Sequence, residues 1–139
     1  MKRQQHFFTE YIQLYRPLLN RVNTLLAPYN LFHSQWGVLK LLKMKGEMTS
    51  AEIAAHQQVE KPSITNIMQR LMEMDLVVVR PGLDRRVKHI DLSESGHHTV
   101  ETIMAELEML YCEMLDGVSD EDIGTAIRVM ESARKNLIN

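Results

Sequence analysis

Residues 77–96 read VVVRPGLDRRVKHIDLSESG, and the interpretation of the whole chain depends on this stretch. Two apolar runs flank the segment RPGLDRR, in which Pro-Gly marks a turn. The runs alternate as strands do and predict a β-hairpin with Arg85 and Arg86 at its tip. Such a hairpin suits an enzyme loop, a finger that contacts another protein, or a wing that contacts DNA. The flanking sequence has to distinguish these three classes.

Residues 49–74, just before the hairpin, predict two short helices joined by a tight turn. Thr49-x-x-Glu52 is a capping box, in which the two side chains satisfy free amides at a helix start. Pro62 suits the first turn of the second helix because its missing N–H would have been unpaired there. Helical spacing predicts the buried side of that second helix as Ile64, Ile67, Met68, Leu71 and Met72.

The opposite side of the second helix carries small polar groups, amides and one arginine. Its members are Ser63, Thr65, Asn66, Gln69, Arg70 and Glu73. In the major groove of DNA, Arg pairs with guanine, and Asn or Gln pairs with adenine. This side is therefore a candidate for reading base edges, although an ordinary solvated helix has a similar pattern.

The two ends of the chain predict long amphipathic helices. Apolar residues repeat in steps of three and four from Gln5 to about Leu26, and Pro17 is expected to kink or restart that helix. A second helix is expected from His33 or Ser34 to Lys45. After the hairpin, Ser93 is a candidate N-cap for a helix with a heptad-like stripe at Val100, Ile103, Leu107, Leu110 and Met114.

A last helix is expected after a cap at Ser119 or Asp120, with an apolar stripe at Ile123, Ile127, Met130 and Leu137. Together the terminal helices offer more apolar surface than a small lobe can cover. Pairing with a second copy of the chain would cover it.

Composition narrows the class further. The 139 residues suggest one domain. No apolar run approaches 18 residues, the N-terminal stretch lacks a signal-peptide pattern, and the single Cys112 excludes an internal disulfide, so a cytoplasmic location is expected. The net charge of −2 is the sum of +5 for residues 1–48, 0 for 49–92 and −7 for 93–139. An acidic C-terminal part is expected to face away from any nucleic acid.

The stretch DRRVKHIDLSESG, Asp84 to Gly96, resembles the wing signature D-x-R-x5-[LV]-[ST]-x2-G of the MarR family of bacterial transcription regulators. Three upstream stretches also resemble the family's layout: LFHSQWGVLKLL from Leu31, PSIT from Pro62 and LMEMDLVVVR from Leu71. The similarity runs over essentially the whole chain. At Asp75 the family favours glycine, which implies a left-handed backbone at that position.

This resemblance implies a mainly α fold with a small β-hairpin wing. Residues 1–139 would form a single domain, with a winged helix-turn-helix over about 34–92 and dimerisation helices over about 5–26 and 97–137. The expected function is that of a homodimeric transcriptional regulator, most simply a repressor, that binds a pseudo-palindromic operator on double-stranded DNA. The alternative is a winged-helix module that contacts another protein instead of an operator.

The resemblance also assigns roles to residues. The recognition helix, from about Lys61 to Met74, would enter the major groove with Lys61, Ser63, Thr65, Asn66, Gln69 and Arg70. The wing would use Asp84, Arg85, Arg86 and Lys88, with Arg86 in the minor groove and Asp84 orienting it through an ion pair. Thr49 and Ser50 stand at a helix start, where backbone amides bind phosphate.

Relatives bind aromatic acids between the dimer helices and the winged lobe, which suggests an aromatic effector near Tyr11, Tyr15, Tyr29, His33 and Trp36. Core packing is the competing role for each of these side chains. Some relatives sense peroxide through a cysteine on the first helix, whereas Cys112 lies late in the fifth beside Glu108 and Glu113, and carboxylates make a thiol less reactive.

No metal site, cofactor or catalytic activity is expected. The sequence has no H-x3-H or C-x2-C pair, and the adjacent His97 and His98 point to different faces of a helix. It also lacks G-x-S-x-G, a phosphate loop, and a nucleophile with a base at a fixed spacing.

Overall fold

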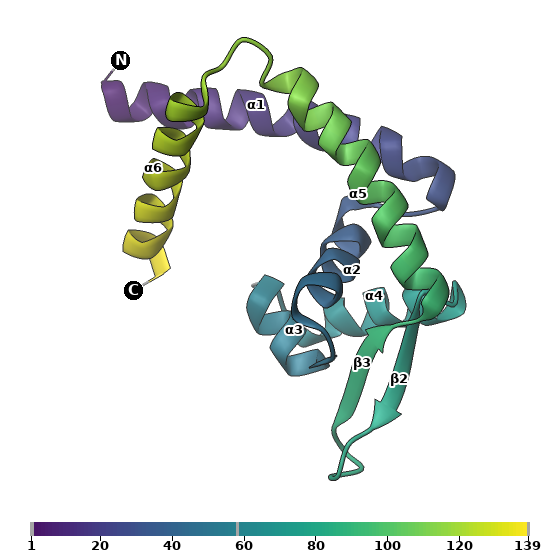
Figure 1. Ribbon diagram of the computed structural model, residues 1–139. Coiled ribbons are helices and arrows are strands. Elements are labelled where there is room, and N and C mark those ends of the chain that lie inside the picture. Colours follow the sequence, from purple (N-terminus) through teal and green to yellow (C-terminus); the bar gives the residue numbers. More distant parts are fainter. Residues whose placement is uncertain (1, 58, 139) are drawn as a thin grey trace. The chain divides into compact units, whose positions relative to one another are not determined.

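The computed structural model describes residues 2–57 and 59–138, without the side chain of Lys61 (Figure 1). Within these residues the chain is mainly helical, with a small sheet, as predicted. The elements in chain order are α1 (Arg3–Leu26), η1 (Ala27–Tyr29), α2 (His33–Lys45), β1 (Met48–Thr49), α3 (Ser50–Gln57), α4 (Lys61–Glu73), β2 (Val77–Pro81), β3 (Lys88–Leu92), α5 (Glu94–Met114) and α6 (Asp120–Ile138). None of the described helices is both long enough and apolar enough to cross a membrane.

The first two helices meet at a tight turn. α1 runs without interruption through Pro17, so the predicted restart there is wrong. The turn after η1 needs Asn30 in the left-handed region, at φ 59°, a conformation that Asn tolerates better than most residues. α2 begins at His33 as expected and ends where Gly46 adopts φ 81°.

Helices α3 and α4 form the predicted helix-turn-helix. In α3 the inward residues are Ile53 and Ala54, both buried. In α4 the buried side consists of Ile64, Met68 and Leu71, with Ile67 half-buried. Met72 is 37% exposed, so its predicted place in the core is wrong.

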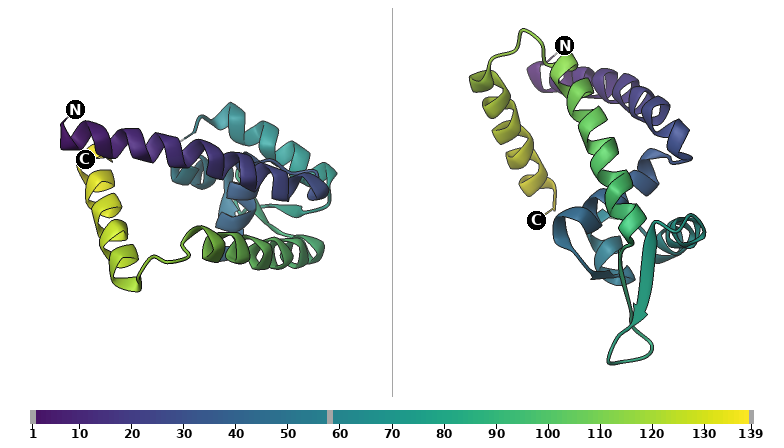
Figure 2. Two further views of the ribbon diagram at one scale, coloured as in Figure 1. Left: turned by 90° about the horizontal axis from the view of Figure 1, so that it is seen from above. Right: turned by 45° about the vertical axis from the view of Figure 1, so that its right-hand side comes forward.

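Three antiparallel strands form one sheet in the order β1-β3-β2. In the β2–β3 hairpin Val77 pairs with Leu92, Val79 with Ile90, and Arg80 with His89. One sheet face is apolar and buried at Val77, Ile90 and Leu92, while the other, here called the polar face, carries Arg80, His89 and Asp91 together with the exposed Val78. The hairpin projects beyond α3 and α4, as Figures 1 and 2 show.

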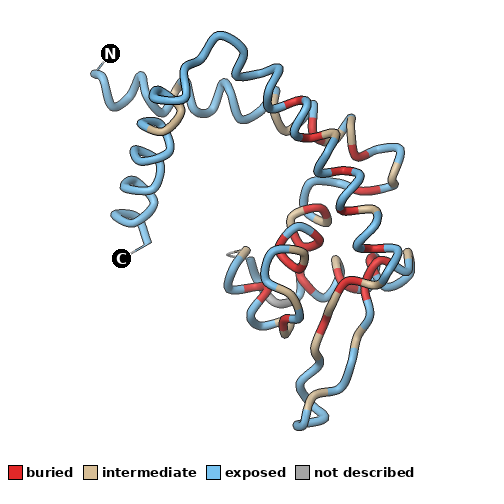
Figure 3. Tube along the Cα trace, viewed as in Figure 1, coloured by how far each residue is buried: buried red, intermediate tan, exposed pale blue. Residues whose placement is uncertain are grey.

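Burial is uneven along the chain (Figure 3). The buried residues cluster on α2, the inner sides of α3 and α4, the sheet, and α5 as far as Leu110. The first half of α1 is exposed, and its exposed apolar side chains are Phe7, Phe8, Tyr11, Ile12, Leu14 and Tyr15.

The chain forms two compact units, Met1–Leu107 and Glu108–Asn139. The second unit holds the end of α5 and all of α6, which Ser119 caps by accepting the Asp122 N–H at 3.1 Å. No described residue of α6 is buried. Met114 is 38% exposed, so the predicted stripes of α5 and α6 are uncovered at their C-terminal members in the single chain.

Candidate nucleic-acid interface

The N-terminus of α3 is held by the predicted capping box. Glu52 N–H donates to Thr49 Oγ1 at 3.1 Å, and Thr49 N–H donates to Glu52 Oε1 at 3.1 Å. The backbone hydrogen bond from Thr49 lowers the pKa of Glu52, so the box stays ionised at neutral pH. The Thr49 amide is engaged inside the box, so a phosphate would compete with Glu52 for it. Ser50 is the first residue of the helix.

The outer side of α4 is exposed along its length. Its described members are Ser63, Thr65, Asn66, Gln69, Arg70 and Glu73, and all of them are exposed. Gln69 Nε2 donates to Glu73 Oε1 at 3.4 Å, one turn further along the helix. Lys61 lies in the first turn of α4, but its side chain is outside the description. Apart from Lys61, the predicted recognition side is thus presented to solvent by one continuous helix.

The end of α4 is shaped by Asp75, which has φ 58°. Its N–H donates to Met72 O at 3.0 Å, and Leu76 N–H donates to Leu71 O at 3.0 Å, which together form a Schellman motif. The left-handed conformation expected from the resemblance is therefore present, with Asp in the place of Gly. The motif turns the chain directly from the helix into the wing.

Both ends of the wing are tied to this turn. The Asp75 carbonyl accepts the Ser93 hydroxyl at 2.6 Å and the Ser95 hydroxyl at 2.7 Å, and Ser93 N–H donates to Leu76 O at 3.0 Å. A Cβ on Gly96 would lie 2.0 Å from Leu76 O, closer than any side chain allows. The L-S-x2-G part of the signature is thus a clasp that fixes the wing to the end of α4.

The wing tip holds Arg86 in a defined orientation. Asp84 Oδ1 accepts Arg86 N–H at 3.0 Å and Nε at 3.3 Å, and Oδ2 accepts Nη2 at 3.3 Å. These contacts lower the pKa of Asp84, with the backbone hydrogen bond as the largest cause. The Arg86 side chain is nevertheless 91% exposed. Arg85 and Lys88 are exposed beside it.

The five aromatic candidates have different environments. Tyr11 and Tyr15 are exposed and stacked, with ring centroids 6.0 Å apart. Trp36 is buried, Tyr29 donates to Glu106, and the exposed His33 donates its backbone N–H to Asn23 at 2.9 Å. The helical rise places Tyr15 about 16 Å along α1 from the end of that helix at Leu26. An effector site at these residues stays a prediction.

Cys112 is exposed, and its thiol donates to Glu108 Oε1 at 3.6 Å. This hydrogen bond raises the pKa of the thiol, so the predicted effect of the neighbouring carboxylate is confirmed for Glu108. Among the residues that the structure describes, no group of three His, Cys, Asp or Glu side chains is placed to hold a metal ion.

Sequence reasoning missed two parts of this surface. One is the strand β1, whose two residues are too few to show a period. The other is the set of polar contacts that Glu47 and Arg80 make at the base of the wing. Glu47 precedes β1, and only the β1–β3 pairing brings it next to the hairpin, so no local pattern could have revealed it.

A helix-turn-helix whose second helix leads into a two-stranded wing defines a winged helix-turn-helix protein. Residues 29–87 match the sequence profile of the MarR family. The HTH-type transcriptional regulator YwoH of Bacillus subtilis is 33% identical over 118 residues, which cover 85% of this chain and 86% of YwoH. The chain belongs to the MarR family of helix-turn-helix transcriptional regulators.

Solved structures show the same fold. Staphylococcus aureus MarR in complex with salicylate and kanamycin matches at a TM-score of 0.90 and 28% identity, over 97% of this chain and 92% of that one. S. aureus MepR in its complex with DNA matches at a TM-score of 0.83 and 18% identity, over 93% of this chain and 96% of that one.

Proposed function

We propose that this regulator is a homodimeric repressor that binds a pseudo-palindromic operator. Each α4 enters the major groove and reads base edges with the side that contains Asn66, Gln69 and Arg70. Each wing tip enters the adjacent minor groove with Arg86. Two such units related by a two-fold axis read half-sites about 34 Å apart, one helical turn of DNA.

The observation that carries this proposal is that Arg86 is both exposed and held in one orientation by Asp84. An exposed arginine ordinarily samples many rotamers, and ordering it on binding costs free energy. Here Asp84 already contacts two atoms of the guanidinium and the backbone N–H. The side chain still presents its outer edge to solvent at the end of a projecting hairpin. A narrow minor groove concentrates negative potential and attracts such an arginine.

The exposed apolar side chains of the terminal helices support the dimer. The first half of α1 exposes Phe7, Phe8, Tyr11, Ile12, Leu14 and Tyr15, and α6 exposes Ile127, Met130, Leu137 and Ile138. Contiguous apolar surface of this kind is unusual on a monomer and marks an interaction surface. A second copy of the chain covers both helices in the proposed assembly.

A small aromatic acid is the proposed effector that releases the operator. The salicylate of the S. aureus MarR complex supports this class of ligand. The proposed lining is Tyr11, Tyr15, Tyr29, His33 and Trp36, with the tyrosine pair of α1 and the end of that helix brought into one crevice by the dimer. The test is whether a millimolar aromatic acid shifts the melting temperature or the DNA affinity of the protein.

The proposed regulator acts in the cytoplasm, without metal, cofactor or catalysis. Its purified form is expected to turn over no ester, phosphoester or peptide substrate above buffer. Activity that survives repurification and is lost in a point variant would contradict this part of the proposal.

Fluorescence anisotropy with two duplexes tests the DNA function. One duplex is the segment upstream of the protein's own gene, and the control is the same segment shuffled. The native duplex is expected to bind more tightly, with affinity falling steeply between about 50 and 200 mM salt as counterions are released. Equal weak binding to both duplexes would contradict operator recognition at this site. No binding to either at low salt would favour a winged module that contacts a protein.

A further inference from the structure

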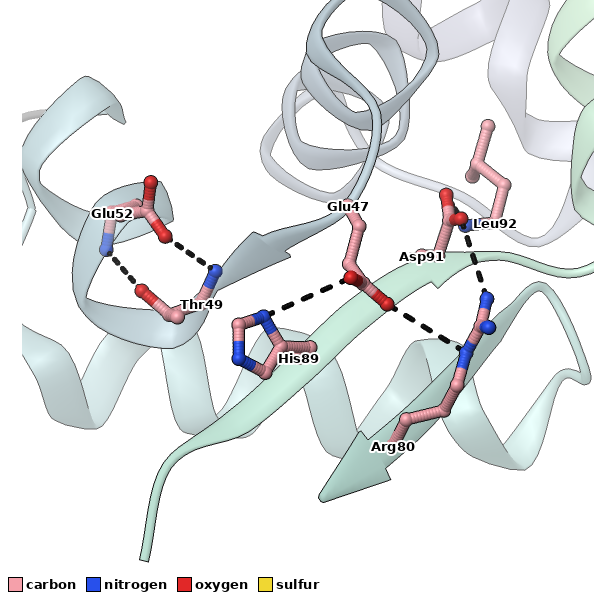
Figure 4. A network of polar contacts seen from close by, with 7 residues as sticks. All are labelled: Glu47, Thr49, Glu52, Arg80, His89, Asp91 and Leu92. Carbon is pink, nitrogen blue, oxygen red and sulfur yellow. Dashed lines mark hydrogen bonds and ion pairs between the residues drawn. The ribbon is translucent and has the colours of Figure 1, made fainter. Parts of the chain in front are cut away.

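We infer that Glu47 and Arg80 form a strut that sets the direction of the wing, so that both are positioning residues for DNA contact. This inference rests on the proposed DNA-binding function and adds residues that do not touch base or phosphate. Figure 4 shows the contacts around Glu47, Arg80, His89 and Asp91 on the polar face of the sheet.

The strand register explains why these side chains meet. Thr49 pairs with His89, and His89 pairs with Arg80, so the three share one face of the sheet. Asp91 lies two residues beyond His89 on the same strand, which places it on the same side. Glu47 precedes β1, and its contacts with Arg80 and His89 place its carboxylate on this side as well. The polar face therefore carries residues from the β1 segment, the central strand β3 and the outer strand β2.

Arg80 connects the two outer segments across β3. Its Nε lies 3.6 Å from Glu47 Oε1, and its Nη2 lies 3.6 Å from Asp91 Oδ2. Adjacent strands are about 4.8 Å apart, so a side chain that crosses the central strand must be as long as arginine. Asp91 is itself fixed, because its Oδ1 accepts the Leu92 N–H at 2.8 Å.

His89 adds a further contact under the turn. Its Nδ1 lies 3.9 Å from Glu47 Oε2, and a Cβ on Gly82 would lie 2.8 Å from its Nε2. The ring thus fills the space between Glu47 and the start of the wing tip. Glu47 is the member that joins the wing to the rest of the lobe, since it stands just before β1 and α3.

The clasp at Asp75 and this strut restrain the wing in different ways. The clasp holds the two ends of the hairpin to α4, and the pairing of Thr49 with His89 holds β3 to β1, but β2 pairs with β3 alone. The strut adds a side-chain connection from β2, at Arg80, to the segment that begins the helix-turn-helix. It therefore restrains the angle between the wing and the recognition helix from the side of β2.

If the strut positions the wing, removing the charge of Glu47 changes the DNA affinity in the direction opposite to that expected from charge alone. DNA is a polyanion, so removing an acidic charge near the wing should strengthen binding if charge alone matters. Glu47→Gln keeps the size of the side chain but loses the ion pair with Arg80. If Glu47 positions the wing, the substitution weakens binding to the native duplex, by about fivefold or less because exposed ion pairs are individually weak.

The matched control is Glu60→Gln. It removes one acidic charge from the residue before α4, whose side chain makes no capping hydrogen bond. This variant should bind as tightly as the wild type or more tightly. Binding by Glu47→Gln that equals or exceeds that of Glu60→Gln, at an unchanged melting temperature, would overturn the strut.

A double-mutant cycle asks whether Arg80 acts through the wing tip. Arg80 is 62% exposed, so direct contact with a phosphate is the competing role. Arg80→Gln should weaken binding in the wild type and have little further effect in an Arg86→Ala background. Equal effects in the two backgrounds, with a salt slope reduced by about one, would assign Arg80 to a phosphate instead.

Backbone order parameters from ¹⁵N NMR relaxation separate this inference from the DNA function. In protein without DNA, the order parameters of the wing amides of Gly82 and Val87 should be about 0.85, and Glu47→Gln should lower these order parameters to about 0.6. If Glu47→Gln lowers the order parameters but the wild type does not bind DNA, the proposed operator binding is refuted and the strut is supported. Unchanged order parameters in Glu47→Gln would overturn the strut whatever the protein binds.

Discussion

The winged part of the chain and its terminal helices differ in how far their apolar side chains are buried within the chain. From α2 to β3 the apolar side chains are mostly buried, and the exposed side of α4 is polar. In the first half of α1 and in α6 the stripes stay exposed, with no described residue of α6 buried. The apolar side chains of the first region are thus mostly covered within the chain, whereas those of the second region are left exposed.

The wing sharpens this comparison. It exposes the two arginines of its tip, yet hydrogen bonds hold both its base and its tip in place. At the wing tip Arg86 is exposed in a fixed geometry, and Leu83 next to this turn is exposed as well, whereas the first half of α1 exposes a group of large apolar side chains. On this difference we base the proposal that the first region recognises DNA and the second assembles the dimer.

The largest expected effect is on stability and comes from replacing glycine by alanine, once in the clasp and once in α6. Gly96→Ala should destabilise the fold by about 2–4 kcal/mol, because the new Cβ would meet Leu76 O in a packed clasp. Gly124→Ala in α6 has room, with Arg128 Nη1 at 3.5 Å from the new Cβ, and should stabilise by up to about 1 kcal/mol. Thermal unfolding followed by circular dichroism checks both. A wild-type melting temperature in Gly96→Ala would refute the clasp.

Arg86→Ala should weaken operator binding next most strongly, by about 1–3 kcal/mol per wing. Asp84→Ala should weaken it less, because Arg86 keeps its charge but loses its orientation. Anisotropy titration measures both. Each side chain is exposed, so an unchanged melting temperature serves as the folding control. If Arg86→Ala binds the operator like the wild type, the wing has been assigned wrongly.

Changes on α4 should alter sequence preference more than overall affinity. Asn66→Ala or Gln69→Ala should relax discrimination at one base pair of each half-site by about 1–3 kcal/mol. Competition binding with operators mutated one position at a time measures this loss of discrimination. Glu60→Gln, at a residue whose side chain makes no capping hydrogen bond, serves as the control. A uniform loss over all positions would place Asn66 or Gln69 on the phosphate backbone.

The smallest expected effect concerns Cys112. Because Glu108 raises the pKa of the thiol, little thiolate exists at neutral pH, and alkylation by iodoacetamide should be slower than that of glutathione. Glu108→Gln should remove the hydrogen-bonded carboxylate, lower the pKa and speed alkylation modestly. Mass spectrometry of timed samples measures the rate. Fast alkylation of the wild type, unchanged in Glu108→Gln, would reopen the redox role.

The sequence predicted the winged lobe well where local rules govern it. The capping box at Thr49, the start of α4 near Pro62 and the cap at Ser93 all follow from short-range hydrogen bonding and backbone preference. The turn was expected at Pro81-Gly82, but Pro81 is the last residue of β2, and the turn lies further on, where Val87 N–H donates to Asp84 O at 2.9 Å. The Asp84–Arg86 pair followed from family resemblance, and its spacing of two residues suits a turn. Each of these contacts joins residues that are only a few positions apart in the sequence.

Longer-range features escaped prediction for physical reasons. The clasp joins Asp75 to Ser93 and Ser95 across the whole hairpin, and the strut joins Glu47 to Arg80 across three strands. Pro17 was expected to kink or restart α1, and the restart is absent because the helix continues through Pro17. Met72 was assigned to the core by its spacing, yet it lies at the edge of the buried side. Neither pairing partners nor the edge of a core can be read from periodicity alone.

Sedimentation velocity of the protein with its upstream duplex tests most directly the proposal that the winged part binds DNA and the terminal helices form the dimer. Wild-type protein should be a dimer in solution and should place two chains on each duplex. Leu14→Glu, which puts a charge on the exposed apolar side of α1, should give a folded monomer that binds the duplex far more weakly. A wild-type monomer, or one chain per duplex with undiminished affinity in Leu14→Glu, would contradict the account.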